Sequence, residues 1–445
     1  MVNPTLSPAA PAAPPHTVSE TIDHRQVETA LRTIRTGDQI SNQSALANAL
    51  DNPLLNQAER DLIIQTLLEG DDHDLELFYA NDIDRSWRGD DPTLAADQQI
   101  IGEALQQAFE DGIIDTDDLL KIADRNGTGN GAQRLLDTLQ HGGSGPNGTV
   151  EALSDALWER NGNDGLDRAG ASLGYMSSPD LQARNLNTTE LRREAFESLV
   201  AFNDAESYQD FPIDSISDQW QSSALAAAGS LFVNNSTELV DYYTGANGGT
   251  VQTEVLAQFM GQTVFNPDAS SIVLDRQRDL VPAIESAISN HADRLLAGAA
   301  DAPADSREQE GLIEQFARLD AAISGGVAVA LDRYSDEILA NEASKQQFAS
   351  IVGALVGKTP ASKVPGSNLI VKEVAEAIYD ALSSDPERPE QALAGVIHDA
   401  HFDQVRELAD ELGQTGLTSA FNGAYSAELQ QIQQNLNVNL GGHKD

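Results

Sequence analysis

The chain has 445 residues, of which 40% are hydrophobic and 5% aromatic, and its 70 acids against 27 bases give a formal net charge of −43 at pH 7. A charge of this sign repels phosphate backbones and anionic membrane surfaces, so nucleic acid is excluded as an expected partner. The chain has no cysteine, which excludes disulfides, thiolate nucleophiles and cysteine-based metal sites. No stretch approaches the roughly 18 consecutive apolar residues of a membrane span, so no stable membrane insertion is expected.

The first 18 residues contain five prolines together with Ser, Thr and Ala. Such a segment buries too little apolar surface to offset its ordering entropy, so residues 1–18 are predicted to be a disordered head. A basic region followed by an apolar one is missing, which argues against a Sec signal peptide. The composition is typical either of a frayed terminus or of an uncleaved export signal, such as a type III secretion signal. We therefore expect a protein secreted without a cleaved Sec signal, or cytoplasmic before export.

From about residue 20 the chain alternates segments of helical hydrophobic period with short polar breaks, and no βαβ rhythm appears. This pattern predicts an all-α, multi-helix fold with little or no β structure. The aromatic and acidic stretch 205–214, interrupted by Pro212, predicts a boundary between a helical domain at 19–204 and a second one at 214–437, followed by a polar tail at 438–445. The predicted helices cover residues 56–70, 94–112, 117–124, 149–160, 189–203, 215–234, 306–322, 327–342, 346–356, 369–383, 390–401, 403–412 and 424–436.

Strand signals are few. The best candidates for short extended pieces are Val264–Phe265 and Ser271–Leu274.

Residues with catalytic chemistry are sparse, and the most suggestive are two histidines. His398 and His401 stand at i and i+3 and share one predicted helix face, with Asp399 and Asp403 close in sequence. Zinc would require a third ligand from elsewhere in the chain. Glu159 follows Trp158 at a predicted helix end, where a glycan-binding cleft is one interpretation. Glu159, His398 and His401 are thus candidate catalytic residues, and polar side chains at helix ends are the simpler interpretation.

One loop resembles a calcium-binding loop. Asp124, Asn126 and Thr128 fit positions 1, 3 and 5 of an EF-hand, but Leu135 occupies position 12, where a bidentate Glu is needed. An ordinary loop is the simpler interpretation, so no metal and no cofactor are expected.

The segment from Lys345 to Lys372 departs from the acidity of the chain. It contains four of the six lysines, namely Lys345, Lys358, Lys363 and Lys372, with no acid between the first and the last. Two interpretations stay open. One is a buried hairpin of helices whose lysines pair with local acids, and the other is a docking or hinge surface that the acidic body of the protein contacts.

Three segments resemble helical regions of secreted bacterial effectors and polymorphic toxins: Ala226–Tyr243, Val255–Asp268 and Ile351–Leu382. The resemblance lies in amphipathic helices interrupted by Asn and in a Gly-Lys-x-Pro…Pro-Gly turn between helices. It implies a role in delivery, folding or partner binding, and it brings no catalytic residue with it.

These observations predict a secreted bacterial effector or delivery-associated protein that acts through protein–protein binding. Its partner would be the secretion machinery, a chaperone or a host target. One alternative is a polymer-degrading hydrolase with a carboxylate site in a helical cleft. The other is a salt-adapted cytoplasmic protein, for which an acidic, lysine-poor surface is expected. Whether the chain is an enzyme is undecided, with the missing motifs favouring a non-enzyme, and its oligomeric state is left open.

Overall fold

A computed structural model describes residues 21–35, 39–78, 92–124, 130–142, 148–160, 166–202, 217–246, 251–267, 273–274, 278–357, 367–384 and 389–436. The predicted head at 1–18 and tail at 438–445 lie outside this set. Over the described residues the chain is helical, apart from one pair of two-residue strands, and the all-α prediction is confirmed. Contacts divide these residues into two compact units, one comprising 21–78 and 92–150 and the other 151–436.

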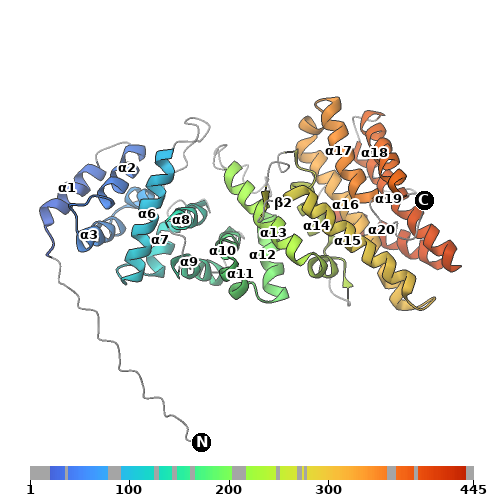
Figure 1. Cartoon of the computed structure of the whole chain (residues 1–445), viewed down its shortest axis with the longest axis horizontal. Helices are drawn as coiled ribbons and strands as arrows, with labels where there is room; N and C mark the ends of the chain where they lie inside the picture. The colour runs from blue at the N-terminus through green and yellow to red at the C-terminus, as the bar shows by residue number, and fades with distance from the viewer. Residues whose placement is uncertain are drawn as a thin grey trace, which may run out of the picture. The chain divides into compact units, whose positions relative to one another are not determined.

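The first unit is built from short helices, shown in blue to blue-green in Figure 1. Its elements are α1 (His24–Ile34), α2 (Gln39–Leu50), α3 (Gln57–Leu68), α4 (Asp72–Leu75), the 3-10 helix η1 (Glu76–Phe78), α6 (Pro92–Glu110), α7 (Thr116–Asp124), α8 (Asn130–His141) and the start of α9 (Gly148–Glu159).

A buried glutamate organises the start of this unit. Asn56 caps α3 by accepting a hydrogen bond from the Glu59 backbone N–H (3.0 Å), while one Glu59 oxygen accepts from the Asn56 N–H (2.9 Å). This reciprocal arrangement satisfies two helix-terminal donors at once. The second Glu59 oxygen accepts from the backbone N–H of Asp23 (2.7 Å), the N-cap of α1. One carboxylate, 2% exposed, therefore fixes the starts of both α1 and α3.

The second unit continues along the chain from α9. Its further elements are α10 (Leu166–Met176), α11 (Pro179–Asn185), α12 (Thr189–Phe202), α13 (Ser217–Tyr243), α14 (Thr253–Thr263), β1 (Val273–Leu274), β2 (Arg278–Asp279), α15 (Leu280–Asp301), α16 (Arg307–Ile338), α17 (Glu342–Gly357), α18 (Ser367–Ser384), α19 (Pro389–Leu412) and α20 (Gly416–Leu436).

The predicted domain boundary at 205–214 does not coincide with the division between these units. That stretch lies outside the described residues, but the helices on either side of it, α12 and α13, pack against each other. The Phe196 ring of α12 lies 6.0 Å from the Phe232 ring of α13, and Arg192 donates to both oxygens of Glu238 (3.0 and 2.7 Å). The segment with a linker-like composition therefore connects two helices that pack into the same core.

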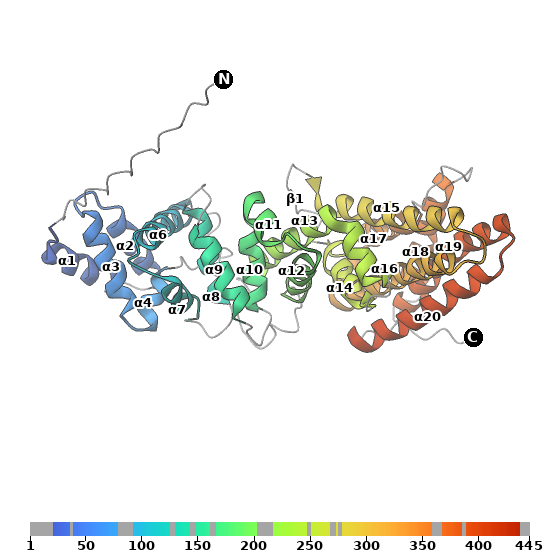
Figure 2. The same ribbon diagram turned by 90° about the horizontal axis from the view of Figure 1, so that it is seen from below.

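Helix α16 is the centre of the second unit, and Figures 1 and 2 show it among α14, α15, α17 and α20. The predicted break between residues 322 and 327 is wrong, because α16 runs through it. A Cβ on Gly325 would lie 2.8 Å from Ile432 and 2.9 Å from Ala257, so this glycine lets neighbouring helices approach rather than ending the helix. Every residue from 320 to 331 is buried. The predicted break at residue 402 is likewise absent from α19.

Of the two strand predictions, one is wrong and one is confirmed in part. Val264 has helical dihedral angles (φ −70°, ψ −40°) at the end of α14, and both Val264 and Phe265 are buried in the core. Their β-branched and aromatic side chains serve packing here rather than a sheet. Val273–Leu274 form β1, antiparallel to β2, while residues 271–272 lie outside the described set.

Candidate functional site

The two candidate histidines occupy different environments on α19. His401 is 1% exposed, and its Nδ1 lies 2.6 Å from Oδ1 of Asp320, which is 0% exposed. Its ring meets that of Phe316 edge-on, with centroids 5.0 Å apart. His398 is half-buried, with Nε2 3.0 Å from Oδ1 of Asn422. The structure therefore turns His401 into the core, where a substrate does not reach it.

The His401–Asp320 pair joins α19 to α16 across 81 residues of sequence. Asp320 Oδ2 and His401 Nε2 are buried without a hydrogen-bond partner among the described residues. A buried carboxylate is costly unless it is paired, so the imidazole is a structural partner for Asp320. Sequence reasoning missed Asp320, since nothing local distinguishes it from the other acids.

Glu159 is exposed at the C-terminal end of α9. Helices α9 and α19 are not among the described helices that pack closely on each other, so Glu159 and the two histidines belong to separate helix interfaces.

The calcium-loop candidates are only partly described. Asp124 is exposed at the end of α7, and Asn126 and Thr128 lie outside the described residues. Over the part of the chain that is described, no three His, Asp or Glu side chains gather in a way that could hold a metal ion.

Two of the four candidate lysines are described, and each has an acid on its own helix as partner. The Lys345 amine lies 3.3 Å from Glu342 on α17, and the Lys372 amine lies 3.3 Å from Glu376 on α18. Lys358 and Lys363 lie outside the described residues. The two helices pack closely, since a Cβ on Gly353 would lie 2.8 Å from that of Ala375. These pairings agree with the hairpin interpretation and leave the docking interpretation a prediction.

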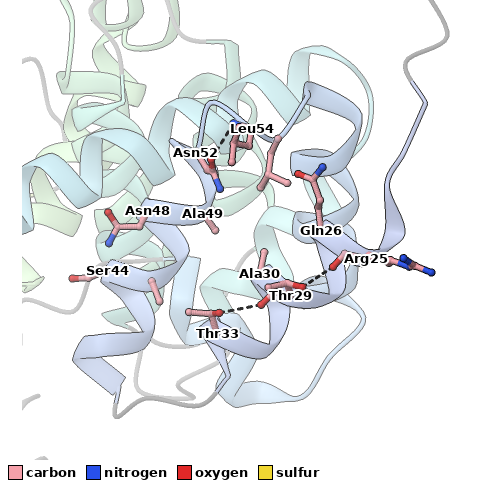
Figure 3. Close-up of a pocket in the computed structure, with 12 residues that line it drawn as sticks. Arg25, Gln26, Thr29, Ala30, Thr33, Ser44, Asn48, Ala49, Asn52 and Leu54 are labelled. Carbon is pink, nitrogen blue, oxygen red and sulfur yellow. Dashed lines mark hydrogen bonds between the residues drawn. The ribbon is translucent and has the colours of Figure 1, made fainter.

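The structure also reveals a groove of about 890 Å³ in the first unit, which sequence reasoning did not single out (Figure 3). It lies between α1 and α2 and extends to the loop after α2. Most of its lining side chains are small or uncharged: Gln26, Thr29, Ala30 and Thr33 from α1, Ser44, Ala45, Asn48 and Ala49 from α2, and Asn52, Leu54 and Leu55 from the loop, with Arg25 as the one charged member.

A tight turn places a leucine in solvent at the edge of this groove. The Asn52 side-chain oxygen accepts a hydrogen bond from the Leu54 N–H (3.0 Å), and the Asn52 carbonyl accepts from the Leu55 N–H (3.1 Å). Pro53 fixes the backbone φ angle between them. As a result Leu55 is 4% exposed, while Leu54 is 76% exposed.

The two threonine hydroxyls of the α1 wall are already engaged. The Thr29 hydroxyl donates to the Arg25 carbonyl (2.7 Å), and the Thr33 hydroxyl donates to the Thr29 carbonyl (3.0 Å), as the dashed lines in Figure 3 show. Because these donors are satisfied within the helix, covering them costs less free energy than burying free hydroxyls. The part of the wall formed by Thr29, Ala30 and Thr33 is thus chemically close to an apolar surface.

One charged residue lines the groove, and an acid outside the lining is bonded to its other end. Arg25 and Leu54 mark one end, where the Arg25 guanidinium has no hydrogen-bond or ion-pair partner among the described residues. At the other end the Ser44 hydroxyl donates to the Asp97 carboxylate of α6 (2.6 Å). Helix α2, which forms one wall, has no charged residue. The α2 wall is therefore an uncharged surface on a chain of net charge −43.

Two acids of the second unit have a raised pKa, and neither belongs to the groove. Burial raises the pKa of Asp293 to about 6, and burial also raises that of Glu197, although Arg193 opposes the change.

Among the described helices, none combines the length and the apolar character that crossing a membrane requires. The chain matches no protein-family model, no curated protein sequence and no solved structure.

Proposed function

We propose that this chain is a secreted bacterial effector or delivery-associated protein that acts by binding another protein, and that the groove between α1 and α2 is its binding surface. The observation that carries the proposal is the groove itself, small-residue and almost uncharged, with Leu54 exposed at its edge. Exposed apolar area beside a concave surface marks sites of association. Such a surface on a strongly acidic chain also minimises the repulsion and desolvation that a partner would meet.

Two features of the sequence support the delivery role. The head at 1–18 has the composition of an uncleaved export signal, and the chain lacks cysteine, so its folding does not depend on an oxidising compartment. Deleting residues 2–18 should abolish export from a bacterium with an active secretion apparatus, while far-UV circular dichroism of the purified variant stays unchanged. Undiminished export of the truncated chain would contradict this part of the proposal.

Binding through the groove is tested with a photo-crosslinking amino acid at Asn48, inside the groove, and at Ser426, an exposed position on α20. Only the Asn48 protein should form a defined protein adduct in cells. The adduct should disappear with Leu54→Asp and persist with Leu412→Asp, because Leu412 is the other large apolar side chain exposed in the described chain (37%). Equal adducts at both positions, or insensitivity to Leu54→Asp, would refute the groove as the binding surface.

A further inference from the structure

Helix α20 meets α14, α16 and α19 through polar groups along much of its length. From this surface we infer that α20 is a reversibly docked helix, which opens as one piece while the rest of the second unit stays folded. The inference concerns the second unit alone, so it is independent of the groove between α1 and α2.

Polar contacts recur along α20 from its second turn to its last. Four of its residues contact polar side chains of three other helices: Asn422 with His398 of α19 (3.0 Å), Tyr425 with Ser324 of α16 (3.1 Å), and Glu428 and Asn435 with Thr253 and Glu254 of α14 (2.7 and 3.1 Å). Contacts between parts of a chain that separate and re-form are more polar than permanent ones, because each part must then be stable in water. The surface of α20 has this character.

The buried acid of α20 is only partly compensated. Glu428 is 7% exposed, and one of its oxygens accepts a hydrogen bond from the Thr253 hydroxyl. Its other oxygen lies 3.7 Å from Nε of Arg318, which is too far for a hydrogen bond, and this Nε is buried without a hydrogen-bond partner among the described residues. A buried ion pair stabilises a fold only when its geometry repays the lost hydration. Both groups regain that hydration when α20 leaves.

Two more buried oxygens lie near the ends of α20. Glu254 receives the Asn435 amide on one oxygen, while its second oxygen is buried without a partner in the described part of the chain. In the turn before α20, the side-chain oxygen of Gln414 is in the same situation. Whether such an oxygen is bare or hydrated in the docked state, it meets bulk water when α20 is released. These groups therefore favour opening.

The contact between α14 and α16 has the opposite character. A Cβ on Gly261 would lie 2.6 Å from the Val329 side chain, and a Cβ on Gly326 would lie 2.9 Å from that of Met260. Small and apolar groups pack closely here and bury no charge, which is the kind of contact that opens only when the whole unit unfolds. Helix α16 is thus the internal reference against which the opening of α20 is measured.

Native-state hydrogen exchange of the full chain, read by mass spectrometry at increasing urea concentrations below the unfolding transition, tests the inference. Peptides from residues 416–436 should have protection factors at least about 100-fold below those from residues 311–331. Their protection should be similar along the whole helix and should fall as urea is added, because a cooperative opening exposes surface.

The absence of cysteine allows α20 to be tethered chemically. In the variant Glu254→Cys with Asn435→Cys, a short bismaleimide joins α20 to α14 at side chains that are in contact. Its control is Arg192→Cys with Glu238→Cys, which joins α12 to α13 and leaves α20 alone. The first tether should raise the protection of residues 416–436 at least about tenfold and leave residues 311–331 unchanged. The control tether, and the first variant capped with a monofunctional maleimide, should not.

Equal protection and equal urea dependence of the two segments would overturn the inference, because α20 would then belong to the cooperative core. Protection that declines gradually towards residue 436 and does not respond to urea would overturn it as well, since that is fraying of a helix end. Joint exchange of residues 389–412 and 416–436 would replace α20 with the α19–α20 pair as the opening segment. A tether without effect on residues 416–436 would also contradict an opening of α20 away from α14.

Discussion

The contact between α14 and α16 predicts that two glycines of one helix respond in opposite ways to the same substitution. A Cβ on Gly326 would lie 2.9 Å from the Met260 Cβ and 3.1 Å from the Ala257 carbonyl oxygen of α14. Neither atom moves by a side-chain rotation, so Gly326→Ala has to push the helices apart. Gly311, one of the first residues of the same helix, has nothing within 4 Å of such a Cβ.

The magnitudes follow from two opposing effects. Alanine in place of glycine stabilises a helix by about 1 kcal/mol, and this is the whole effect expected for Gly311→Ala. At Gly326 the added methyl costs about 2–3 kcal/mol of overpacking, which exceeds the helical gain. We expect Gly326→Ala to lower the free energy of unfolding by about 1–2 kcal/mol, so the two variants should differ by about 2–3 kcal/mol.

Urea unfolding of the full chain, followed by hydrogen-exchange mass spectrometry of peptides covering residues 311–331, assigns the transition to the second unit. Gly311→Ala should move its midpoint to higher urea and Gly326→Ala to lower urea. If Gly326→Ala stabilised the protein as much as Gly311→Ala does, α14 and α16 would not be in the contact described here.

Four further predictions concern buried polar groups. Burial, together with Arg294, lowers the pKa of His291 from 6.5 to about 4, so the unfolded imidazole takes up a proton below about pH 6.5 while the folded one stays neutral. The free energy of unfolding therefore contains a contribution from His291 that is complete above pH 6.5 and falls by about 3 kcal/mol between pH 6.5 and pH 4. Urea unfolding over this pH range should show this loss in the parent chain and not in His291→Gln. Asp293→Asn should stabilise the protein by about 1 kcal/mol at pH 7, after allowance for partial exposure, because burial raises the pKa of the carboxyl from 3.8 to about 6. The gain in melting temperature should begin to decrease below pH 6 and vanish near pH 4, where the unfolded carboxyl is protonated as well. His401→Leu should lower the free energy of unfolding by about 3–5 kcal/mol, because it leaves Asp320 buried and unpaired. Changing both residues to Leu should lower it far less. Additive losses in this double-mutant cycle would show that the two side chains do not interact. Glu59→Gln should cost about 1–2 kcal/mol in thermal unfolding of the first unit, while Glu69→Gln, at an exposed position on the same segment, should change little.

Sequence patterns identified elements better than they identified contacts. Gly112 ends α6 with φ +70°, and Asp115 accepts a hydrogen bond from the Asp118 N–H (3.1 Å) at the start of α7, as local rules predict. The helix break predicted at Gly325–Gly326 is wrong because glycine is also used inside a helix where a neighbouring helix packs too closely for a Cβ atom. That neighbour, α14, lies more than 60 residues earlier in the chain.

The candidate site was hidden for a related reason. Helix α2 combines Ser, Asn, Gln and Ala with few large apolar residues, so its periodicity is weak, and the groove arises only when it packs beside α1. Two signals were present in the sequence. One is the absence of charge from residues 39–50, and the other is the pair of leucines next to Pro53 in a polar turn.

The buried hydrogen bond between Thr253 of α14 and Glu428 of α20 (2.7 Å) spans 175 residues. Both of these helices pack on α16, so part of its central face remains exposed to solvent until α20 has been synthesised. At a translation rate of about 5–20 residues per second, the residues between the end of α16 and the end of α20 take roughly 5–20 s to make, so α14 and α16 wait at least that long for their last neighbour. The core of this unit therefore stays open while the chain from α17 to α20 is made, which leaves an interval in which other molecules can meet incompletely folded helices.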